Sequence, residues 1–288
     1  MIKLPITVVI AVRNEALNLR KCLESLQPAE QVIVVDSNSE DGTPDIAREL
    51  GAEVVQFNYT GGYPKKRQWV LDGNYISNKW VFMVDADEVV PEALWEEIGS
   101  QVNGPRPSDA YLIYKGFHFM ARRFRFGGFS HPAVLLWETG KGRFEETLAI
   151  DENKQDMEVH ERVLVDGTSS YLKTHLIHED FKGLEAYLER HRKYAIWEAA
   201  LRRNFLNTGK WGESDIQPKL FGNSQEFRRF IKKFIIMMPF EAWIWFIYHY
   251  LLKLGFLEGK PGWVASKIRC NYIRQVRALV NGSEKSYL

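Results

Sequence analysis

The sequence predicts an α/β fold built on a mixed, mainly parallel sheet flanked by helices and followed by a helical C-terminal extension. Three observations support this prediction. Short apolar runs alternate with helical patterns in the first third of the chain. Polar or acidic residues directly follow three of these runs. Beyond residue 182 the pattern becomes helical, with a strongly apolar stretch at 234–257.

Four short runs are expected to form strands, at 6–12, 31–35, 53–57 and 80–84. They are rich in β-branched residues and nearly continuous in hydrophobicity, which is typical of strands covered on both faces. Helical patterns at 15–26 and 43–50 separate the first three of them. Strands that alternate with helices in this way predict right-handed crossovers and a parallel sheet.

A turn-rich segment at 104–108 marks a boundary within the chain, and the segment 111–114 after it is expected to form a further strand of the sheet. We therefore divide the chain into 1–105, 106–182 and a helical extension at 183–288. The length of 288 residues, with 45% hydrophobic and 26% charged residues, is that of a globular protein with a real core.

Charge and cysteine content exclude several classes of function. Lys and Arg number 38 against 37 Asp and Glu, so no overall charge favours a nucleic-acid partner. Cys22 and Cys270 lack the spacing of a zinc site or a disulfide framework, which favours a reducing cytosol. The first ten residues lack the pattern of a cleavable signal, so we expect them to be structural.

Polar clusters at 13–15, 36–42 and 85–88 follow three expected strands. In parallel sheets, ligands bind beyond the carboxyl ends of the strands, where loops and helix N-termini offer unpaired donors. The first turn contains neither GxGxxG nor a lysine-bearing phosphate loop, which disfavours dehydrogenases and P-loop enzymes. The segment 36–42 also lacks the glycine and the closing glutamate of a calcium loop.

The acidic segment 85–88 is the strongest candidate for a metal site. Strand alternation is expected to place Asp85 and Asp87 on one side, where their oxygens could face a diphosphate and Mg²⁺ or Mn²⁺. The alternative is a helix cap, because a helix is expected to begin near Pro91.

Four ordered motifs together resemble the family 2 glycosyltransferases. They are Val-Ile-Ala-Val-Arg-Asn-Glu at 9–15, Val-Val-Asp-Ser-Asn-Ser-Glu-Asp-Gly-Thr at 34–43, Lys-Lys-Arg-Gln at 65–68 and Val-Asp-Ala-Asp-Glu at 84–88. The sequence departs from the family pattern at Ala11, where proline is usual, and at Ser37-Asn38, which replace the commoner Asp-Gly.

This resemblance implies a GT-A-type nucleotide-binding domain with an Asp-x-Asp motif. It also implies metal-dependent, inverting transfer from a nucleoside-diphosphate sugar, with UDP favoured. Segment 1–105 would bind the nucleotide sugar, and segment 106–182 would bind the acceptor and provide the base. The substrate-binding residues implied are Ala11, Val12, Arg13, Glu15, Asp36, Lys66, Arg67, Asp85 and Ala86.

The resemblance also implies individual roles. Asp36 and Arg67 would contact the base, and Asp85 the ribose or uridine. Asp87 would bind Mg²⁺ or Mn²⁺ on the diphosphate, with His178 as a further ligand. Lys65 or Lys66 would help to hold phosphate. The alternatives are a solvated basic face at 65–67 and a structural role for the histidine.

Inverting transfer requires a base that removes a proton from the acceptor hydroxyl. The segment His160-Glu161-Arg162 resembles the His-Glu form found in bacterial envelope transferases, which implies Glu161 as the base. Asp156, Glu158 and Glu179 remain competitors, and a surface ion pair of Glu161 with Arg162 is the alternative.

The apolar stretch 234–257 is interrupted by Pro239, Glu241, His249 and Lys253, which disfavours a membrane span. Its Trp and Tyr content, with basic residues upstream, favours helices that lie in a membrane interface. A buried helix hairpin or a dimer contact is the alternative. An interfacial site would suit a glycan or lipid-linked acceptor at the cytoplasmic face of the inner membrane.

Two rival functions stay open at this point. A nucleotidyltransferase also combines an α/β sheet with metal-binding carboxylates, although its basic, glycine-rich loop is missing here. A non-catalytic nucleotide-sugar-binding subunit would keep the pocket without turnover. The sugar, the acceptor, the linkage and the oligomeric state are not fixed by these residues.

Overall fold

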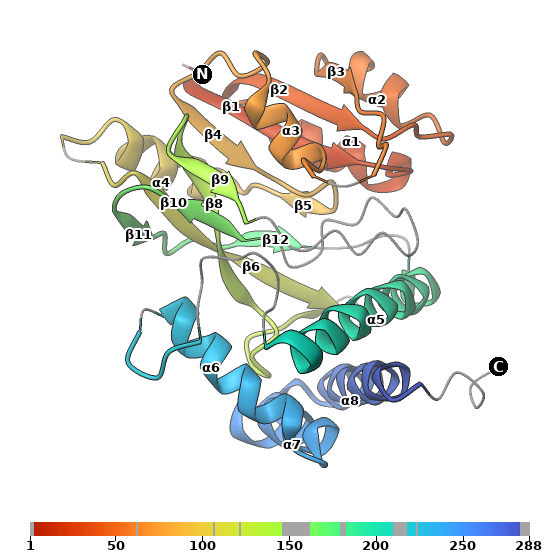
Figure 1. The fold of residues 1–288 in the computed structure, drawn as a ribbon. Helices are drawn as coiled ribbons and strands as arrows, with labels where there is room; N and C mark the ends of the chain where they lie inside the picture. Colours follow the sequence, from red (N-terminus) through yellow and green to blue (C-terminus); the bar gives the residue numbers. More distant parts are fainter. Residues whose placement is uncertain are drawn as a thin grey trace. The chain divides into compact units, whose positions relative to one another are not determined.

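The structure is a computed structural model that describes residues 3–61, 63–105, 107–120, 122–145, 162–178, 183–209, 218–222 and 224–282. These residues form two compact units. The first contains the described residues of 1–123, 130–145 and 151–183, and the second those of 124–129 and 184–288. Figure 1 labels the α-helices and most of the strands of both units.

The first unit is built on one sheet with the strand order β3-β2-β1-β4-β8-β6-β12-β5, and β7 and β11 also pair with β6. The strands of this sheet are β1 (Leu4–Val12), β2 (Ala29–Asp36), β3 (Glu53–Gln56), β4 (Trp80–Met83), β5 (Glu88–Val89), β6 (Ala110–Phe119), β7 (Arg122–Arg123), β8 (His131–Glu138), β11 (Ser169–Tyr171) and β12 (Leu176–His178). A separate two-stranded ribbon pairs β9 (Gly142–Phe144) with β10 (Val163–Val165).

The nucleus of the sheet is parallel and buried on both faces, as its sequence predicts. Strand β1 pairs in parallel with β2 and with β4. Successive side chains of β1 point to opposite faces, so Ile10 packs in the cluster that contains Leu19, whereas Val9 packs in the cluster that contains Val70. Two apolar layers therefore enclose the strand, and its near-continuous hydrophobicity follows from that position.

Antiparallel strands extend this nucleus and make the sheet mixed. Strand β8 runs antiparallel to β4 and to β6, and β12 pairs in parallel with β6. The helices of the first unit are α1 (Ala16–Glu24), α2 (Thr43–Glu49), α3 (Lys66–Asp72) and α4 (Glu92–Val102). The predicted fold class is confirmed: a mixed, mainly parallel sheet flanked by helices, followed by C-terminal helices.

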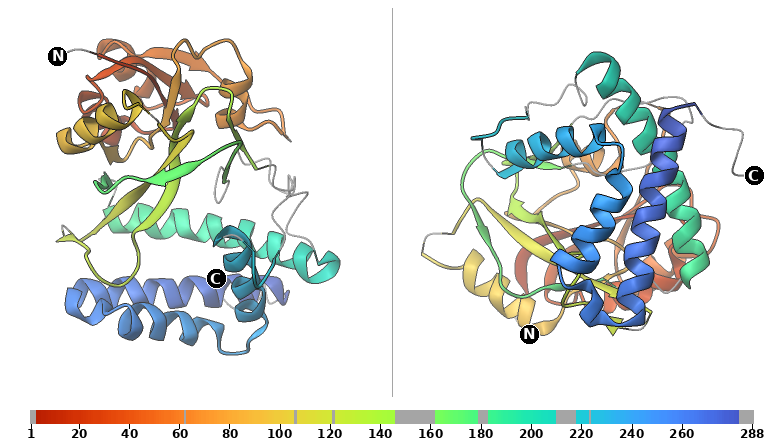
Figure 2. Two further views of the ribbon diagram at one scale, coloured as in Figure 1. Left: turned by 90° about the vertical axis from the view of Figure 1, so that its left-hand side faces the viewer. Right: turned by 90° about the horizontal axis from the view of Figure 1, so that it is seen from below.

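The second unit is helical. Its elements are α5 (Gly183–Thr208), α6 (Ser224–Met237), α7 (Glu241–Ile247), the π-helix η2 (Tyr248–Leu252), the 3₁₀-helix η3 (Gly255–Glu258) and α8 (Lys260–Val280). Helix α8 lies between α5 and α7 in the right-hand view of Figure 2. Small side chains such as Ala199 and Ala242 pack there against Ile273 and Val276, which allows the helices to approach closely.

A buried ion network links helices of this unit. The guanidinium of Arg202 donates to Glu198 Oε1 at 2.8 Å and to Glu241 Oε2 at 2.8 Å, and all three side chains are buried. The hydroxyl of Tyr272 donates to Glu198 Oε2 at 2.6 Å. Because buried charges are tolerated only when they are paired, this network fixes how α5, α7 and α8 meet.

The loop 124–129 belongs to the second unit, although it connects two strands of the first. The backbone amides of Arg125 and Phe126 donate to Glu258 Oε1 at 2.6 and 2.8 Å. His249 Nδ1 lies 2.7 Å from the carbonyl oxygen of Gly127, which fits donation by the ring N–H. These contacts explain why the carboxylate of Glu258 is buried within an apolar part of the chain.

The apolar stretch 234–257 is not one helix. It contains the end of α6, all of α7 and the irregular turns η2 and η3. Within the described ranges, no helix has both the length and the hydrophobicity needed to cross a bilayer.

Candidate active site

Lys66, the first residue of helix α3, contacts the ends of both β1 and β2. Nζ of Lys66 donates to the carbonyl oxygen of Val12 at 3.3 Å and to Ser37 Oγ at 3.2 Å. Lys65 and Lys66 are only 5% and 6% exposed. A solvated face is therefore the wrong interpretation for these two lysines, and the ammonium group of Lys66 lies where β1 and β2 both end.

The loop after β2 is fixed by its own polar side chains. Asp36 accepts hydrogen bonds from the amide and the hydroxyl of Ser39, at 3.1 and 2.5 Å. Asp41 Oδ2 accepts from the amide of Ala16 at the start of α1, at 3.0 Å. The left-handed backbone of Asn14, with φ of 56°, allows the chain to turn sharply between β1 and α1. Asp36 is thus buried at the base of an ordered loop, while Asp41 fastens that loop to α1.

Asp85 lies between two cations. Arg67 Nη2 is 2.6 Å from Asp85 Oδ1, and Lys115 Nζ is 2.5 Å from Asp85 Oδ2. Burial alone would raise the pKa of Asp85, but the charges of Lys115 and Arg67 hold it well below its usual range. The carboxylate is therefore ionised and oriented by both cations.

Lys115 is the site residue that the sequence interpretation missed. Besides Asp85, its ammonium approaches Glu88 Oε1 at 2.9 Å, and Glu88 Oε2 accepts from the amide of Asp85 at 2.8 Å. Burial raises the pKa of Glu88, whereas for Lys115 the opposing effect of burial is exceeded by the two carboxylates, which raise its pKa. An isolated lysine inside the apolar run of β6 was the available sequence signal.

Asp87 contacts His178, whereas the two cations described above hold Asp85. The pairing of β5 with β12 places His178 opposite Glu88 in register, and His178 Nε2 lies 3.0 Å from Asp87 Oδ2. Burial lowers the pKa of His178, but the charge of Asp87 outweighs it and raises the pKa to about 9.

Two expectations about the acidic segment are wrong. Strand β4 ends at Met83 and residues 86–87 form a turn, so strand alternation does not align Asp85 with Asp87. The helix-cap alternative fails as well, because α4 begins at Glu92 and has Pro91 at its cap position. The turn gives the two aspartates different partners: it directs Asp85 toward Lys115 of β6 and Asp87 toward His178 of β12.

The donor atoms present fit a divalent metal ion. A carboxylate oxygen of Asp87 and the imidazole nitrogen of His178 converge, and both ligand types are acceptable to Mn²⁺ once the metal has displaced the proton of His178. Among the described residues, no group of three or more His, Cys, Asp or Glu side chains is arranged to hold an ion. Mg²⁺ and Mn²⁺ commonly use one or two protein ligands and complete their shell with phosphate and water. Two protein ligands are therefore compatible with an ion that arrives with a diphosphate.

The remaining predicted residues lie at the end of β1, at the start of α1 and in the turn after β4, or lie outside the described ranges. Ala11 and Val12 end β1, Arg13 is exposed, Glu15 caps α1 and Ala86 is buried in the turn. Glu161 and its competitors Asp156, Glu158 and Glu179 lie outside the described residues. The next described position is Arg162, whose carbonyl oxygen accepts from the amide of Glu145 at 2.7 Å.

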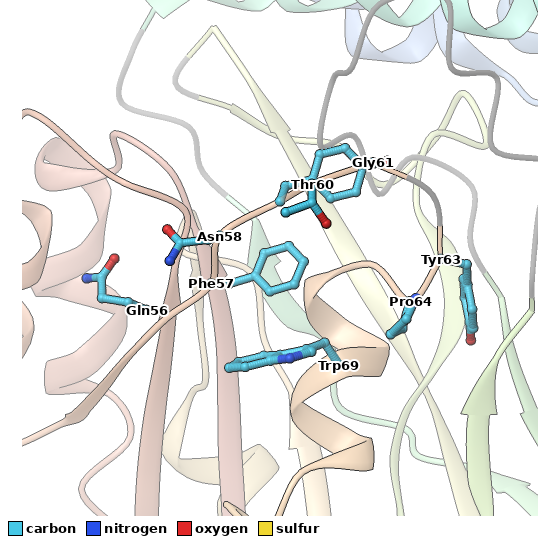
Figure 3. A pocket seen from close by; sticks show the side chains of 9 residues that line it. Gln56, Phe57, Asn58, Thr60, Gly61, Tyr63, Pro64 and Trp69 are labelled. Atoms are coloured by element: carbon cyan, nitrogen blue, oxygen red, sulfur yellow. The ribbon is translucent and has the colours of Figure 1, made fainter.

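A cavity of about 320 Å³ opens between the end of β3 and the start of α3. Its lining has aromatic rings and neutral polar side chains but no charged group: Gln56, Phe57, Asn58, Tyr59, Thr60, Gly61, Tyr63, Pro64 and Trp69. The rings of Phe57 and Trp69 lie in the middle of the lining, with Gln56 and Asn58 on one side of them and Pro64 and Tyr63 on the other (Figure 3). The backbone amide of Phe57 donates to the carbonyl oxygen of Asp36 at 2.8 Å, so this cavity adjoins the loop that follows β2.

Comparison with known proteins extends these observations. The family model described as glycosyl transferase family 2 matches residues 7–172. The chain is 27% identical over 209 residues to the lipopolysaccharide core biosynthesis glycosyltransferase LpsC of Rhizobium meliloti, a match that covers 68% of this chain and 71% of LpsC. It is 34% identical over 111 residues to an uncharacterized glycosyltransferase of Rickettsia bellii, covering 38% of this chain and 36% of that protein.

Among solved structures, one similar chain is glucosyl-3-phosphoglycerate synthase from Mycobacterium tuberculosis, in complex with Mn²⁺, UDP and glucosyl-3-phosphoglycerate. The identity is 25% and the TM-score 0.31, over 39% of this chain and 43% of that one.

Proposed function

This chain belongs to glycosyltransferase family 2, and from that premise we propose a metal-dependent, inverting transferase of the GT-A type. It moves a sugar from a nucleoside-diphosphate sugar, with UDP favoured, to a glycan or glycolipid acceptor in the synthesis of envelope polysaccharide. The likeness to LpsC supports the envelope role. The family assignment also argues against the nucleotidyltransferase alternative.

One observation carries the proposal: the turn after β4 divides its carboxylates between two tasks. Asp85 is neutralised by Arg67 and Lys115, while Asp87 faces His178. The first pair of contacts suits recognition of uncharged donor groups by a fixed carboxylate. The second leaves an oxygen and a nitrogen ligand together for a cation bound to diphosphate.

The donor nucleoside would lie across the ends of β1, β2 and β4. Asp36 and Arg67 would contact the base, and Asp85 the ribose. The neutral, aromatic lining of the cavity beside Asp36 suits a flat, uncharged ring, and we assign the cavity to the base. Lys66 would stabilise phosphate through its charge, in addition to fixing the strand ends.

Transfer would proceed in one displacement. The acceptor oxygen forms a bond to the anomeric carbon while the bond from that carbon to the diphosphate oxygen breaks, and the hydroxyl proton passes to the carboxylate of Glu161. When bound, the metal ion would neutralise charge on the departing diphosphate. His178 and Asp87 would hold and orient that ion, and Arg67 and Lys115 would keep Asp85 in place.

We also propose that the enzyme works at a membrane surface, with a lipid-linked acceptor at the cytoplasmic face of the inner membrane. The helical second unit supports this proposal, because its apolar residues remain exposed. Self-association of the chain is the competing explanation for that exposure.

Thermal melting with a panel of nucleotide sugars, each with and without Mn²⁺ or Mg²⁺, tests the donor assignment. One nucleotide sugar should raise the melting temperature selectively, and only with the metal. Release of nucleoside diphosphate should then depend on acceptor. Selective binding without release would identify a non-catalytic subunit. Release of pyrophosphate when the chain is instead given a nucleoside triphosphate and a sugar 1-phosphate would identify a nucleotidyltransferase.

A further inference from the structure

Helix α6 has an exposed apolar stripe. Phe227, Ile231 and Phe234 recur at the spacing of one helix face, and Met238 continues it beyond the last turn. Their exposed fractions are between 40 and 53%. A helix in a soluble protein normally buries such a stripe against its own core, so this one lacks cover from the described residues.

A second stripe continues along α7 and η2. Phe240, Trp243, Ile247, Leu251 and Leu254 recur at intervals of three or four residues and are 43 to 69% exposed. Leu252, Phe256, Leu257 and Trp263 extend the exposed apolar surface around the following turn. Together these two stripes and the turn form what we term the apolar surface of the second unit. Large exposed apolar patches mark interaction sites.

The charges around this surface have one sign. Residues 224–282 contain ten Lys and Arg but only three acidic residues. Glu241 is buried beside Arg202, Glu258 is buried by the amides of the loop 124–129, and Glu226 pairs with Lys219 at 3.0 Å. Exposed basic residues remain at Lys233, Lys253, Lys260, Lys267 and Arg274. The segment therefore combines apolar exposure with a positive surface.

This combination selects among possible partners. A second copy of the chain docked face to face would bring positive charge against positive charge, which opposes a symmetric dimer. An anionic bilayer offers the complementary pair: an acyl region for the Phe, Leu and Ile side chains and negative headgroups for the lysines. The indole rings of Trp243 and Trp263 are suited to the boundary between these regions.

We propose that the apolar surface formed by α6, α7, η2 and η3 inserts into the headgroup region of an anionic lipid bilayer and holds the enzyme there as a peripheral protein. This inference rests on the membrane contact proposed above and names the surface that makes it. It requires no particular sugar donor. The buried network of Arg202, Glu198 and Glu241 would keep the helices rigid while they insert.

Sedimentation of the full chain with vesicles tests the inference. The protein should pellet with phosphatidylcholine vesicles that contain about 30% phosphatidylglycerol, and binding to pure phosphatidylcholine should be at least tenfold weaker. Phe234→Ser with Leu251→Ser, one change on each stripe, should weaken binding at least tenfold. Lys233→Glu with Lys253→Glu should weaken it similarly, since each headgroup contact contributes about fivefold.

A matched control replaces two exposed apolar residues of the first unit, Leu17 and Tyr171, by serine. This variant should bind vesicles like the wild type. Circular dichroism melting of each variant verifies that the fold is retained. Absence of wild-type binding to the anionic vesicles would overturn the inference, as would equal losses in the control, or a dimer in sedimentation equilibrium that the stripe variant disperses.

Release of nucleoside diphosphate from the donor distinguishes failure of this inference from failure of the proposed function. The stripe variant should release nucleoside diphosphate from the donor at the wild-type rate with a water-soluble acceptor. Vesicle binding without any such release would instead contradict the proposed glycosyl transfer and leave the membrane surface standing.

Discussion

Lys115 places its ammonium 2.9 Å from Oε1 of Glu88, a side chain with no exposed surface. Glu88 lies in β5 and Lys115 in β6, two strands that β12 separates in the sheet, and Asp85 completes the group. Removing one partner of a buried ion pair leaves a charge without compensation.

We therefore expect Lys115→Met to lower the free energy of unfolding by about 3–5 kcal/mol, measured by urea denaturation. Lys79→Met is the matched control, because Lys79 is mostly exposed and lies 4.0 Å from Glu138. The control should change stability by less than about 1 kcal/mol. Equal effects in the two variants would contradict the buried pairing.

Arg67→Gln tests donor recognition. The guanidinium holds Asp85 Oδ1 at 2.6 Å and would contact the nucleoside base. Loss of a charged hydrogen bond of about 1.5–3 kcal/mol should raise the donor Kd about tenfold to a hundredfold. Titration calorimetry measures this change. Arg20→Gln, which removes a surface pair with Glu49, should leave the donor Kd as it is.

Asp87→Ala and Glu161→Gln should each abolish transfer and leave the fold intact. The first removes a metal ligand and the second removes the proton acceptor. Donor turnover by the purified variants, with melting temperature as the check on folding, measures both effects. Glu158→Gln is the control for the base: loss of activity there, with turnover retained in Glu161→Gln, would move the role to Glu158.

Stability at acid pH should depend on His249. Burial lowers its pKa to about 4, although the carbonyl of Gly127 opposes this shift. Above about pH 6.5 the ring is neutral in both the folded and unfolded states, so His249 makes no contribution to the pH dependence. As pH falls from about 6.5 to 4, only the unfolded state binds the proton, and stability decreases by about 1.4 kcal/mol per pH unit.

His249→Gln should remove that slope, because glutamine can donate to the same carbonyl without titrating. Denaturant unfolding between pH 4 and 7 measures the difference. His191, whose pKa burial also lowers to about 4, should leave a residual slope in the variant. Identical pH profiles for the variant and the wild type would contradict a buried, neutral His249.

The sequence predicted the elements that local patterns determine. Continuous β-branched runs identified β1, β2 and β4, and Asp36 and Asp85 lie where the sequence predicted polar residues, at or just beyond the ends of β2 and β4. The order of four short motifs predicted the family, which the match over residues 7–172 confirms. The roles assigned to all the site residues, from Asp36 to Glu161 and His178, stay predictions.

Long-range pairing explains what the sequence could not predict. Strands β5 and β12 have two and three residues, too few for any periodicity, so local patterns could not predict the pairing that brings His178 to Asp87. Only the family resemblance implied that these two residues act together. Lys115 reaches Asp85 only because β6 joins the sheet through β8. The alternation rule failed for Asp85 and Asp87 because β4 ends two residues before the first of them.

The loop 124–129 gives the chain an interleaved construction. The backbone amides of Arg125 and Phe126 in this loop donate to the carboxylate of Glu258. During synthesis the loop is made well before Glu258, so these hydrogen bonds can form only after the C-terminal helices have been added. A fragment beginning at 184 would leave Glu258 without these donors, and one ending at 183 would leave the loop without its anchor. Exchange of C-terminal helices between related enzymes should therefore succeed only when the donor sequence brings its own version of this loop.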